Sequence, residues 1–214
     1  MLREFLARPE VTELCELRGR FGIMAYHGGN LERTTDAVAN EVAERTGSSF
    51  YGIVQAPPHR HHIASTHFAP AHSSVLSDFL EHVEVVITIH GYGRRRHWRH
   101  LLLGGRNRAL AKHLATHLRD GIPSRYQVLD ELEAIPKELK GLHPANPVNL
   151  PPRQGVQIEL PPTIRWNYKE WGWSDHAGVS RTVGVEKLID ALCAAVSSWT
   201  DVDAEFDRAP EIGD

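Results

Sequence analysis

The sequence has no long hydrophobic run, no marked excess of one charge, and no internal repeat or low-complexity tract. No apolar stretch approaches the roughly 18 residues needed to cross a bilayer, so no membrane association is expected. The net charge of -3 argues against wholesale nucleic-acid binding. Residues 1–20 alternate charged and apolar side chains, unlike a signal peptide. We therefore expect a cytoplasmic protein.

Cysteine is also scarce, and the two present, Cys15 and Cys193, lie in helical patterns among apolar residues. Small buried thiols without a chemical role are the expected assignment for both. A chain of 214 residues with 41% hydrophobic residues suffices for one domain with its own core. We expect a single domain over residues 1–200, followed by a frayed acidic tail over 201–214.

Apolar and amphipathic segments alternate along the chain, which predicts the α/β class. The run Val85-Val86-Ile87-Thr88-Ile89 is typical of a central strand covered on both faces. The predicted strands are Phe21–Tyr26, Phe50–Val54, Val83–His90, Leu101–Leu103, Tyr126–Leu129 and Gly155–Leu160, and the predicted helices are Thr34–Arg45, Ser74–His82, Asn107–Asp120 and Thr182–Trp199. This order favours an open, mixed but mainly parallel sheet flanked by helices. The proline-rich segment 142–153 is expected to be a fixed loop.

Histidines end two of these strands, and each is followed by glycine-containing turns. His27 is followed by Gly28-Gly29 and, one turn later, by Glu32, and His90 is followed by Gly91. Side chains at the carboxyl ends of neighbouring parallel strands face the same crevice. Two histidines and one carboxylate with an open fourth position form a typical catalytic zinc set. The alternative for each residue alone is structural: a histidine that caps a carbonyl, or a glutamate that complements a helix dipole.

A second carboxylate, Glu159, lies in the predicted strand Gly155–Leu160, where alternation separates it from the apolar Val156 and Ile158. If this strand is central, burial raises the pKa of Glu159 and suits it to act as a general base. If the strand is at an edge, Glu159 is solvated and has no such role.

The chain resembles the poly-γ-glutamate hydrolases, which include phage enzymes with a zinc-carboxypeptidase-like architecture. The similar segments follow the family order and are Tyr26–Gly29 through Glu32, His62–Phe68, Thr88–Gly91, Leu103–Gly105 and Gly155–Glu159. The four residues between His27 and Glu32 also distinguish the chain from typical metallocarboxypeptidases, which have two. The resemblance implies Zn²⁺ on His27, Glu32 and His90, with Glu159 as the base that assists attack of zinc-bound water on a γ-glutamyl amide.

Four further residues are candidates for substrate binding. Arg94 and Arg95 open a basic run, 94–100, that directly follows His90 and suits an anionic peptide or polyglutamate. His67 lies in a family-like segment where an oxyanion or carboxylate donor is expected. Arg153 precedes the Glu159 strand and is a candidate for gripping a substrate carboxylate. The alternative for the arginines is a solvated basic surface that serves only solubility.

Three questions remain open at this stage. The aromatic segment 166–180 either shapes a local pocket or forms a satellite patch beneath a loop, and the second is favoured. The activity has two alternatives: a zinc amidohydrolase for a small acyl-amino acid or cell-wall peptide, and a non-enzymatic phage-related protein that binds anions or nucleic acid. The sequence does not determine the oligomeric state, and a monomer is expected.

Overall fold

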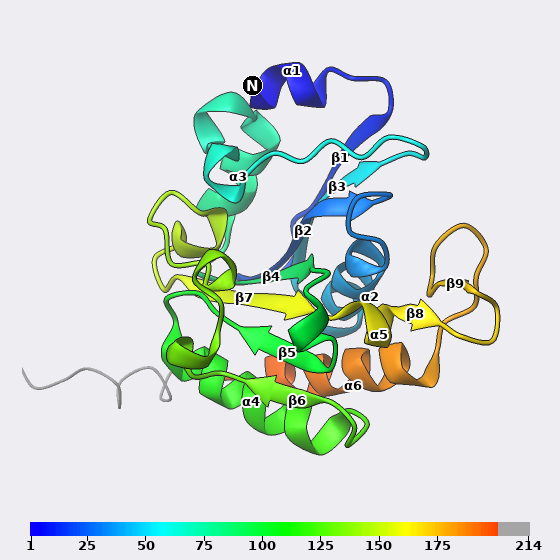
Figure 1. Ribbon diagram of the computed structural model, residues 1–214. Coiled ribbons are helices and arrows are strands. Elements are labelled where there is room, and N and C mark those ends of the chain that lie inside the picture. The colour runs from blue at the N-terminus through cyan, green and yellow to red at the C-terminus, as the bar shows by residue number, and fades with distance from the viewer. Residues whose placement is uncertain (201–214) are drawn as a thin grey trace, which may run out of the picture.

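The computed structural model describes residues 1–200, in which a seven-stranded mixed sheet lies between two layers of helices and loops (Figure 1). The strand order is β1-β3-β2-β4-β7-β5-β6. Strands β3, β2, β4 and β7 are parallel, whereas β1 runs antiparallel to β3 and β5 antiparallel to β7. This arrangement confirms the predicted α/β class and the mainly parallel sheet.

The predicted strands and helices are all present, with ends shifted by a few residues. The strands of the sheet are β1 Val11–Glu16, β2 Phe21–Gly29, β3 Ser49–Gln55, β4 Val85–Gly91, β5 His100–Leu103, β6 Gln127–Leu129 and β7 Gly155–Leu160. The helices are α1 Leu2–Leu6, α2 Thr35–Thr46, α3 Ser74–His82, α4 Arg108–Gly121, α5 Pro162–Arg165 and α6 Val183–Ser198. A separate hairpin joins β8 Trp166–Asn167 to β9 Gly172–Trp173.

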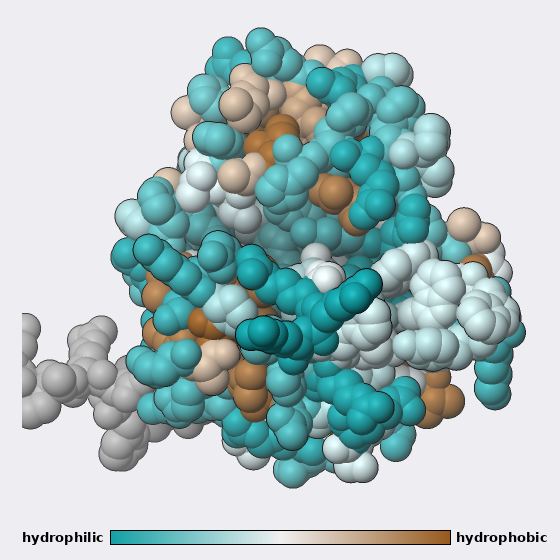
Figure 2. All heavy atoms as spheres, viewed as in Figure 1, coloured by the Kyte–Doolittle hydropathy of each residue, from teal (hydrophilic) through white to brown (hydrophobic). Residues whose placement is uncertain are grey.

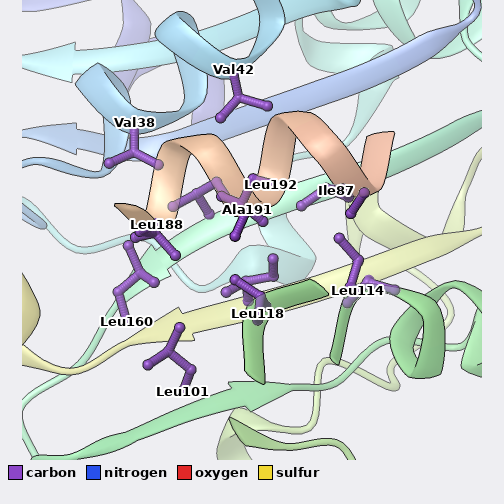
Figure 3. Close-up of a cluster of buried hydrophobic side chains, with 14 of the residues drawn as sticks. Val38, Val42, Ile87, Leu101, Leu114, Leu118, Leu160, Leu188, Ala191 and Leu192 are labelled. Carbon is purple, nitrogen blue, oxygen red and sulfur yellow. The ribbon is translucent and has the colours of Figure 1, made fainter. Parts of the chain in front are cut away.

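The two faces of the sheet pack against different elements. Helices α2, α4 and α6 cover one face, where Leu114, Leu118, Leu188 and Leu192 pack with Ile87 from the central strand (Figure 3). Complete burial of each such leucine contributes roughly 1.5–3 kcal/mol. Helices α1 and α3 cover part of the opposite face, which also carries the buried polar side chains of Gln157 and Glu159. The alternation of side chains along the strands therefore separates an apolar face from a face that also carries polar groups.

Side-chain caps fix the starts of helices α3 and α4. Ser73 Oγ accepts a hydrogen bond from the Leu76 N–H at 3.0 Å, and Asn107 Oδ1 accepts one from the Leu110 N–H at 2.9 Å. These bonds satisfy backbone donors that the first helical turn leaves unpaired. The predicted starts of α3 and α4 thus follow from residues that can be identified in the sequence.

Three predictions about local structure need correction or completion. The segment Val11–Glu16 is an antiparallel edge strand, so Cys15 lies in a strand and not in a helix; both cysteines are only partly buried. The predicted fixed loop 142–153 is ordered around the buried Asn146 and Asn149. The predicted acidic tail, 201–214, lies outside the described residues.

None of the helices in the described part of the chain has the length and apolar character that a membrane span requires.

Candidate metal centre

A β-bulge at the carboxyl end of β2 places His27 in the site. Ala25 pairs with Gly52 and Gly28 with Val54, so Tyr26 and His27 together oppose the single residue Ile53. Such a bulge interrupts alternation and re-aims a side chain. The ring of His27 consequently lies on the same face as that of Tyr26, with their centroids 5.1 Å apart. Strict alternation would have turned His27 toward the helix-covered face.

Two glycines then bring the chain back toward the sheet. Gly29 has a φ of +65°, and a Cβ atom there would overlap the backbone of Gln55. A Cβ atom at Gly28 would overlap Asp36. Both positions therefore require glycine, one for its backbone conformation and both for close approach. The turn that follows is fixed by the Glu32 N–H, which donates to the His27 carbonyl at 3.0 Å.

The Glu32 carboxylate lies between the two histidines. Its Oε1 is 3.1 Å from Nδ1 of His27, and its Oε2 is 3.2 Å from Nδ1 of His90. The backbone N–H of Gly91 also donates to Oε2 at 2.9 Å. The potential ligand atoms of these three side chains all lie within 4.8 Å of one another. The structure thus brings together the three residues predicted as metal ligands, from two neighbouring strands and the turn between β2 and α2.

The electrostatics of this cluster favour a cation. Burial opposes the charge on Glu32, but the two histidines outweigh it and lower the pKa of the carboxyl group. Burial would likewise lower the pKa of His27, but the Glu32 carboxylate outweighs that effect and raises it. In the absence of a metal, a proton on His27 therefore compensates the buried carboxylate.

The hydrogen bonds of the imidazoles show that the donor set fits a metal ion. Nε2 of His27 lies 2.8 Å from the carbonyl oxygen of Ile63, which can only accept, so Nε2 carries a proton. In the neutral ring, Nδ1 then presents a lone pair toward another acceptor, Glu32, and either a proton or a metal ion between the two satisfies both. Such a backbone carbonyl is the usual outer partner of a metal-binding histidine. Two imidazole nitrogens and a carboxylate are also the donors that zinc prefers.

Glu159 is fixed relative to this cluster by the sheet itself. Strand β7 is central, between β4 and β5, and Glu159 is the register partner of His90. Burial raises the pKa of Glu159 to about 7, and Glu32 adds to this effect, whereas His90 opposes it. Gln157 Nε2 donates to Glu159 Oε1 at 2.9 Å and orients the carboxyl group. The predicted condition for a base, a central and buried strand, is therefore met.

Arg165, which the sequence analysis did not single out, is buried beside the cluster. Its Nη1 donates to the carbonyl of Arg33 at 2.9 Å, its Nη2 donates to that of Tyr92 at 3.3 Å, and its guanidinium lies 4.9 Å from the centre of the Trp173 ring. Burial lowers its pKa to about 10, although the Glu32 and Glu159 carboxylates oppose that shift. Its sequence signal is weak: it follows Pro161-Pro162, which end the Glu159 strand and keep the chain near the site.

A cavity of about 340 Å³ opens over the metal cluster and Glu159, which contribute to its floor. Its walls come from two loops, 62–66 and 137–143. This face of the molecule is hollowed beside the end of β4, and strongly hydrophilic side chains gather over the segment that follows this strand (Figure 2). The pocket is therefore open to solvent beside a strongly hydrophilic segment.

Of the histidines in the first wall, His62 and not His67 lines the cavity. The ring of His62 has its centroid 5.1 Å from that of His27. His67 is exposed at the end of the 3-10 turn Ser65–His67 and is not among the lining residues of the described chain. The spacing within the loop could not distinguish the two, because the turn at 65–67 decides which ring faces inward.

The predicted arginines occupy two different places. Arg94 and Arg95 are exposed beyond the end of β4, and Arg94 forms an ion pair of 3.3 Å with Glu138, which lines the cavity. Arg153 lies at the opposite end of the strands, before β7 begins, where its backbone N–H donates to the carbonyl of Glu84. The expectation that Arg153 grips a substrate at this cavity is therefore corrected, because the length of β7 separates it from Glu159.

The aromatic segment forms the β8–β9 hairpin beside the sheet (Figure 1). Trp166 and Trp173 pack edge to face with ring centroids 5.2 Å apart. Trp171 and Tyr168 are exposed. A separate cavity of about 380 Å³ lies against this segment, so both readings of the segment have a structural counterpart.

Comparison with known proteins places the chain in one family. A family model for poly-gamma-glutamate hydrolase matches residues 7–190. Among proteins with curated descriptions, none matches significantly.

Solved structures share the fold. A bacteriophage poly-gamma-glutamate hydrolase is 22% identical, with a TM-score of 0.72, over 95% of this chain and 93% of that protein. A zinc-free form of a protein named YNDL is 21% identical, with a TM-score of 0.73, over 91% and 94% of the two chains. An N-formylglutamate amidohydrolase from Ralstonia eutropha JMP134 is 12% identical, with a TM-score of 0.52, over 89% and 96%.

Proposed function

The chain belongs to the poly-gamma-glutamate hydrolase family, and from this premise we propose that it is a zinc-dependent hydrolase of γ-glutamyl amide bonds. The observation that carries the proposal is the convergence of His27, Glu32 and His90 in one cavity with a buried carboxyl group, Glu159, on the adjacent strand. Each feature alone has a structural explanation, but the four together form the donor set and base of metal-assisted hydrolysis.

In this proposal His27, Glu32 and His90 hold the metal, the two histidines through Nδ1. A bound zinc ion would supply Lewis acidity toward the amide carbonyl and lower the pKa of water at the site. The Ile63 carbonyl keeps the proton of His27 on Nε2 and so keeps Nδ1 available. The Gly91 N–H fixes one oxygen of Glu32 and limits the orientations of that carboxylate.

Glu159 acts as the proton carrier. Its carboxylate accepts a proton from the attacking water as the new C–O bond forms, and it then delivers this proton to the nitrogen of the leaving amine as the C–N bond breaks. A pKa near the working pH suits a group that must both accept and release a proton, and burial raises the pKa of Glu159 to about 7. Gln157 holds the carboxyl group in place during both transfers.

Lysine, arginine and imidazole side chains around the cavity can donate hydrogen bonds and so favour a substrate rich in carboxylates. Lys137, His62 and His143 line its walls, and Arg94 stands beside Glu138 at the same wall. Unlike Arg153, these groups surround the cavity in which the polymer would bind. We infer an anionic chain of γ-linked glutamate as the substrate class, held by these groups while one amide lies over the metal cluster.

The test is the zinc content of protein purified without added metal, measured together with release of glutamyl products from γ-polyglutamate. We expect bound zinc and release of short products, both abolished by a strong chelator and both restored by Zn²⁺. Bound zinc without product release would refute the substrate and retain the metal centre. Absence of zinc with full activity would refute the metal mechanism.

A second candidate, hydrolysis of a small acyl-amino acid, is favoured by the volume of the cavity, about 340 Å³, which suits a ligand of that size. Comparison of a short γ-glutamyl peptide with the long polymer as substrates separates the two candidates. A higher kcat/KM for the polymer supports the first, and turnover restricted to the short amide supports the second.

A further inference from the structure

A second group of potential metal ligands lies outside the active-site cavity. It comprises Glu10, in the segment before β1, and His59 and His61, in the loop after β3. Glu10 Oε1 is 3.6 Å from His59 Nδ1 and 3.3 Å from His61 Nε2. The ligand atoms of the three side chains all lie within 4.8 Å of one another. The group therefore offers the same two imidazole nitrogens and one carboxylate as the first centre.

The backbone that carries this group is held in place by buried amide side chains. Gln55 clamps His61 from both sides: its Oε1 accepts from the His61 N–H at 2.7 Å, and its Nε2 donates to the His61 carbonyl at 2.9 Å. Asn30 Nδ2 donates to the His59 carbonyl at 3.0 Å, and the Ala56 N–H donates to that of Glu10 at 2.8 Å. Both amide side chains belong to buried residues. The three ligand positions are thus fixed before any ion arrives, which lowers the entropic cost of binding.

A positive group already lies beside the cluster. Arg8 Nη1 is 2.9 Å from His61 Nε2 and 3.9 Å from Glu10 Oε1. Because arginine can only donate a hydrogen bond, His61 Nε2 must accept one. This nitrogen therefore carries no proton and has a lone pair that a metal ion could use. The side chain of Arg8 is 45% exposed, so it can swing into solvent at little cost. The guanidinium of Arg8 therefore occupies the position that a metal ion with a preference for nitrogen and carboxylate ligands would take.

We propose that Glu10, His59 and His61 form a second binding site for a divalent transition-metal ion of the Zn²⁺ type, and that Arg8 leaves when the ion binds. Imidazole and carboxylate together suit such ions better than Mg²⁺ or Ca²⁺. The exposure of His59 and His61 leaves further coordination positions to water. The site is therefore distinct in residues from the active-site cluster and is reached from the surface.

The position of the site gives it a defined effect on the first centre. The loop that begins with His59 continues through His62, whose ring lies beside that of His27, to Ile63, whose carbonyl accepts from His27 Nε2. An ion on His59 and His61 would cross-link this loop to the segment that carries Glu10. Occupancy of the second site would thus restrain the loop that orients a ligand of the first.

The experiment is equilibrium dialysis of the full 214-residue chain against buffered Zn²⁺, with bound metal measured by elemental analysis. We expect two equivalents for the unaltered protein, one for the His59→Ala/His61→Ala variant and two for the control His72→Ala, which removes an exposed histidine elsewhere. In a His27→Ala/His90→Ala background, Zn²⁺ should still raise the Tm, and His59→Ala/His61→Ala should abolish that rise. Glu10→Gln provides a smaller change for the same comparison.

Arg8→Gln is the sharpest variant, because a purely structural role for Arg8 does not predict tighter metal binding. Removal of this competing exposed cation should lower the Kd of the second site about fivefold. A single equivalent lost only with His27→Ala/His90→Ala would overturn the second site and leave the proposed function intact. A single equivalent lost only with His59→Ala/His61→Ala would do the reverse. An unchanged or raised Kd in Arg8→Gln would overturn the displacement of Arg8.

Discussion

His90 and Glu159 are register partners on the adjacent parallel strands β4 and β7. A candidate metal ligand and a candidate base are therefore held at a distance set by main-chain hydrogen bonds and not by a flexible loop. Residues placed on neighbouring strands of a sheet keep their relation more accurately than residues on loops. The chemistry of the site can consequently be probed by changes that alter one side chain and leave the sheet intact.

Replacement of Glu159 by glutamine should abolish the base and spare the metal. The glutamine side chain has the same shape, and its amide oxygen can still accept from Gln157 Nε2. We expect a fall in kcat of about 10²- to 10⁴-fold, the usual contribution of general acid–base catalysis, with unchanged zinc content. Rates on γ-polyglutamate and elemental analysis check this. Glu81→Gln, a change in a carboxylate on α3 outside the cavity, is the control. Normal turnover by Glu159→Gln would remove Glu159 from the mechanism.

Loss of either strand-end histidine should release the active-site metal. His27→Ala and His90→Ala each remove one of three donors, so we expect each to lose one equivalent of bound zinc together with hydrolysis. His62→Ala serves as the matched variant, because its ring lines the same cavity but is not part of the ligand group. It should retain the metal. Full occupancy of the first centre in His27→Ala would show that His27 is not a ligand.

The glycine turn after His27 can be tested with a pair of matched variants. Gly29 and Gly47 have nearly equal φ angles, +65° and +67°, but a Cβ atom overlaps the backbone of Gln55 at Gly29 and meets nothing within 4 Å at Gly47. Gly47→Ala should cost about 1–2 kcal/mol of unfolding free energy through its backbone conformation alone and leave zinc binding unchanged. Gly29→Ala should cost more and weaken zinc binding, because the turn carries Glu32. Urea unfolding and zinc titration measure both effects. Equal losses in the two variants would contradict the steric argument.

Arg165 is expected to be a structural support of the site. Lysine cannot span the carbonyls of Arg33 and Tyr92 as the guanidinium does, so Arg165→Lys should lower the free energy of unfolding by about 1–3 kcal/mol. Urea denaturation at neutral pH provides the measurement. Arg125→Lys, at an exposed arginine over the Tyr126 ring, should change stability by less than about 0.5 kcal/mol. A loss in Arg165→Lys no greater than in this control would contradict the support role.

The parts of the fold that sequence reasoning could predict are those governed by local pattern. The apolar run 85–89 and the alternation of 155–160 identify β4 and β7, and capping residues such as Asn107 mark helix starts. The edge strand Val11–Glu16 escaped prediction because it mixes exposed polar and apolar residues and is stabilised by pairing with β3. Pairing between distant segments leaves little local signal.

The site shows the same division. His27, Glu32, His90 and Glu159 could be selected because each ends or follows a recognisable strand. The inward turn of His62 and the burial of Arg165 depend on how separate loops pack, which no spacing encodes. Arg153 was placed wrongly because it precedes the first residue of β7. The two ends of a strand lie on opposite sides of the sheet, and the cavity lies at the carboxyl end of β7.

The bulge at Tyr26 and His27 interrupts the alternation of side chains along β2. Before it, residues alternate in step with the helix-packed core; at the bulge Tyr26 and His27 lie on one face, and Gly28 and Gly29 continue the strand one position out of step. Substitutions on either side can be accommodated separately, but a change of chain length within the bulge cannot. Deletion of a single residue there would leave the core pattern of the strand intact but place only one of the two rings on the face where both now lie. The length of this strand, as much as its composition, is therefore under functional constraint.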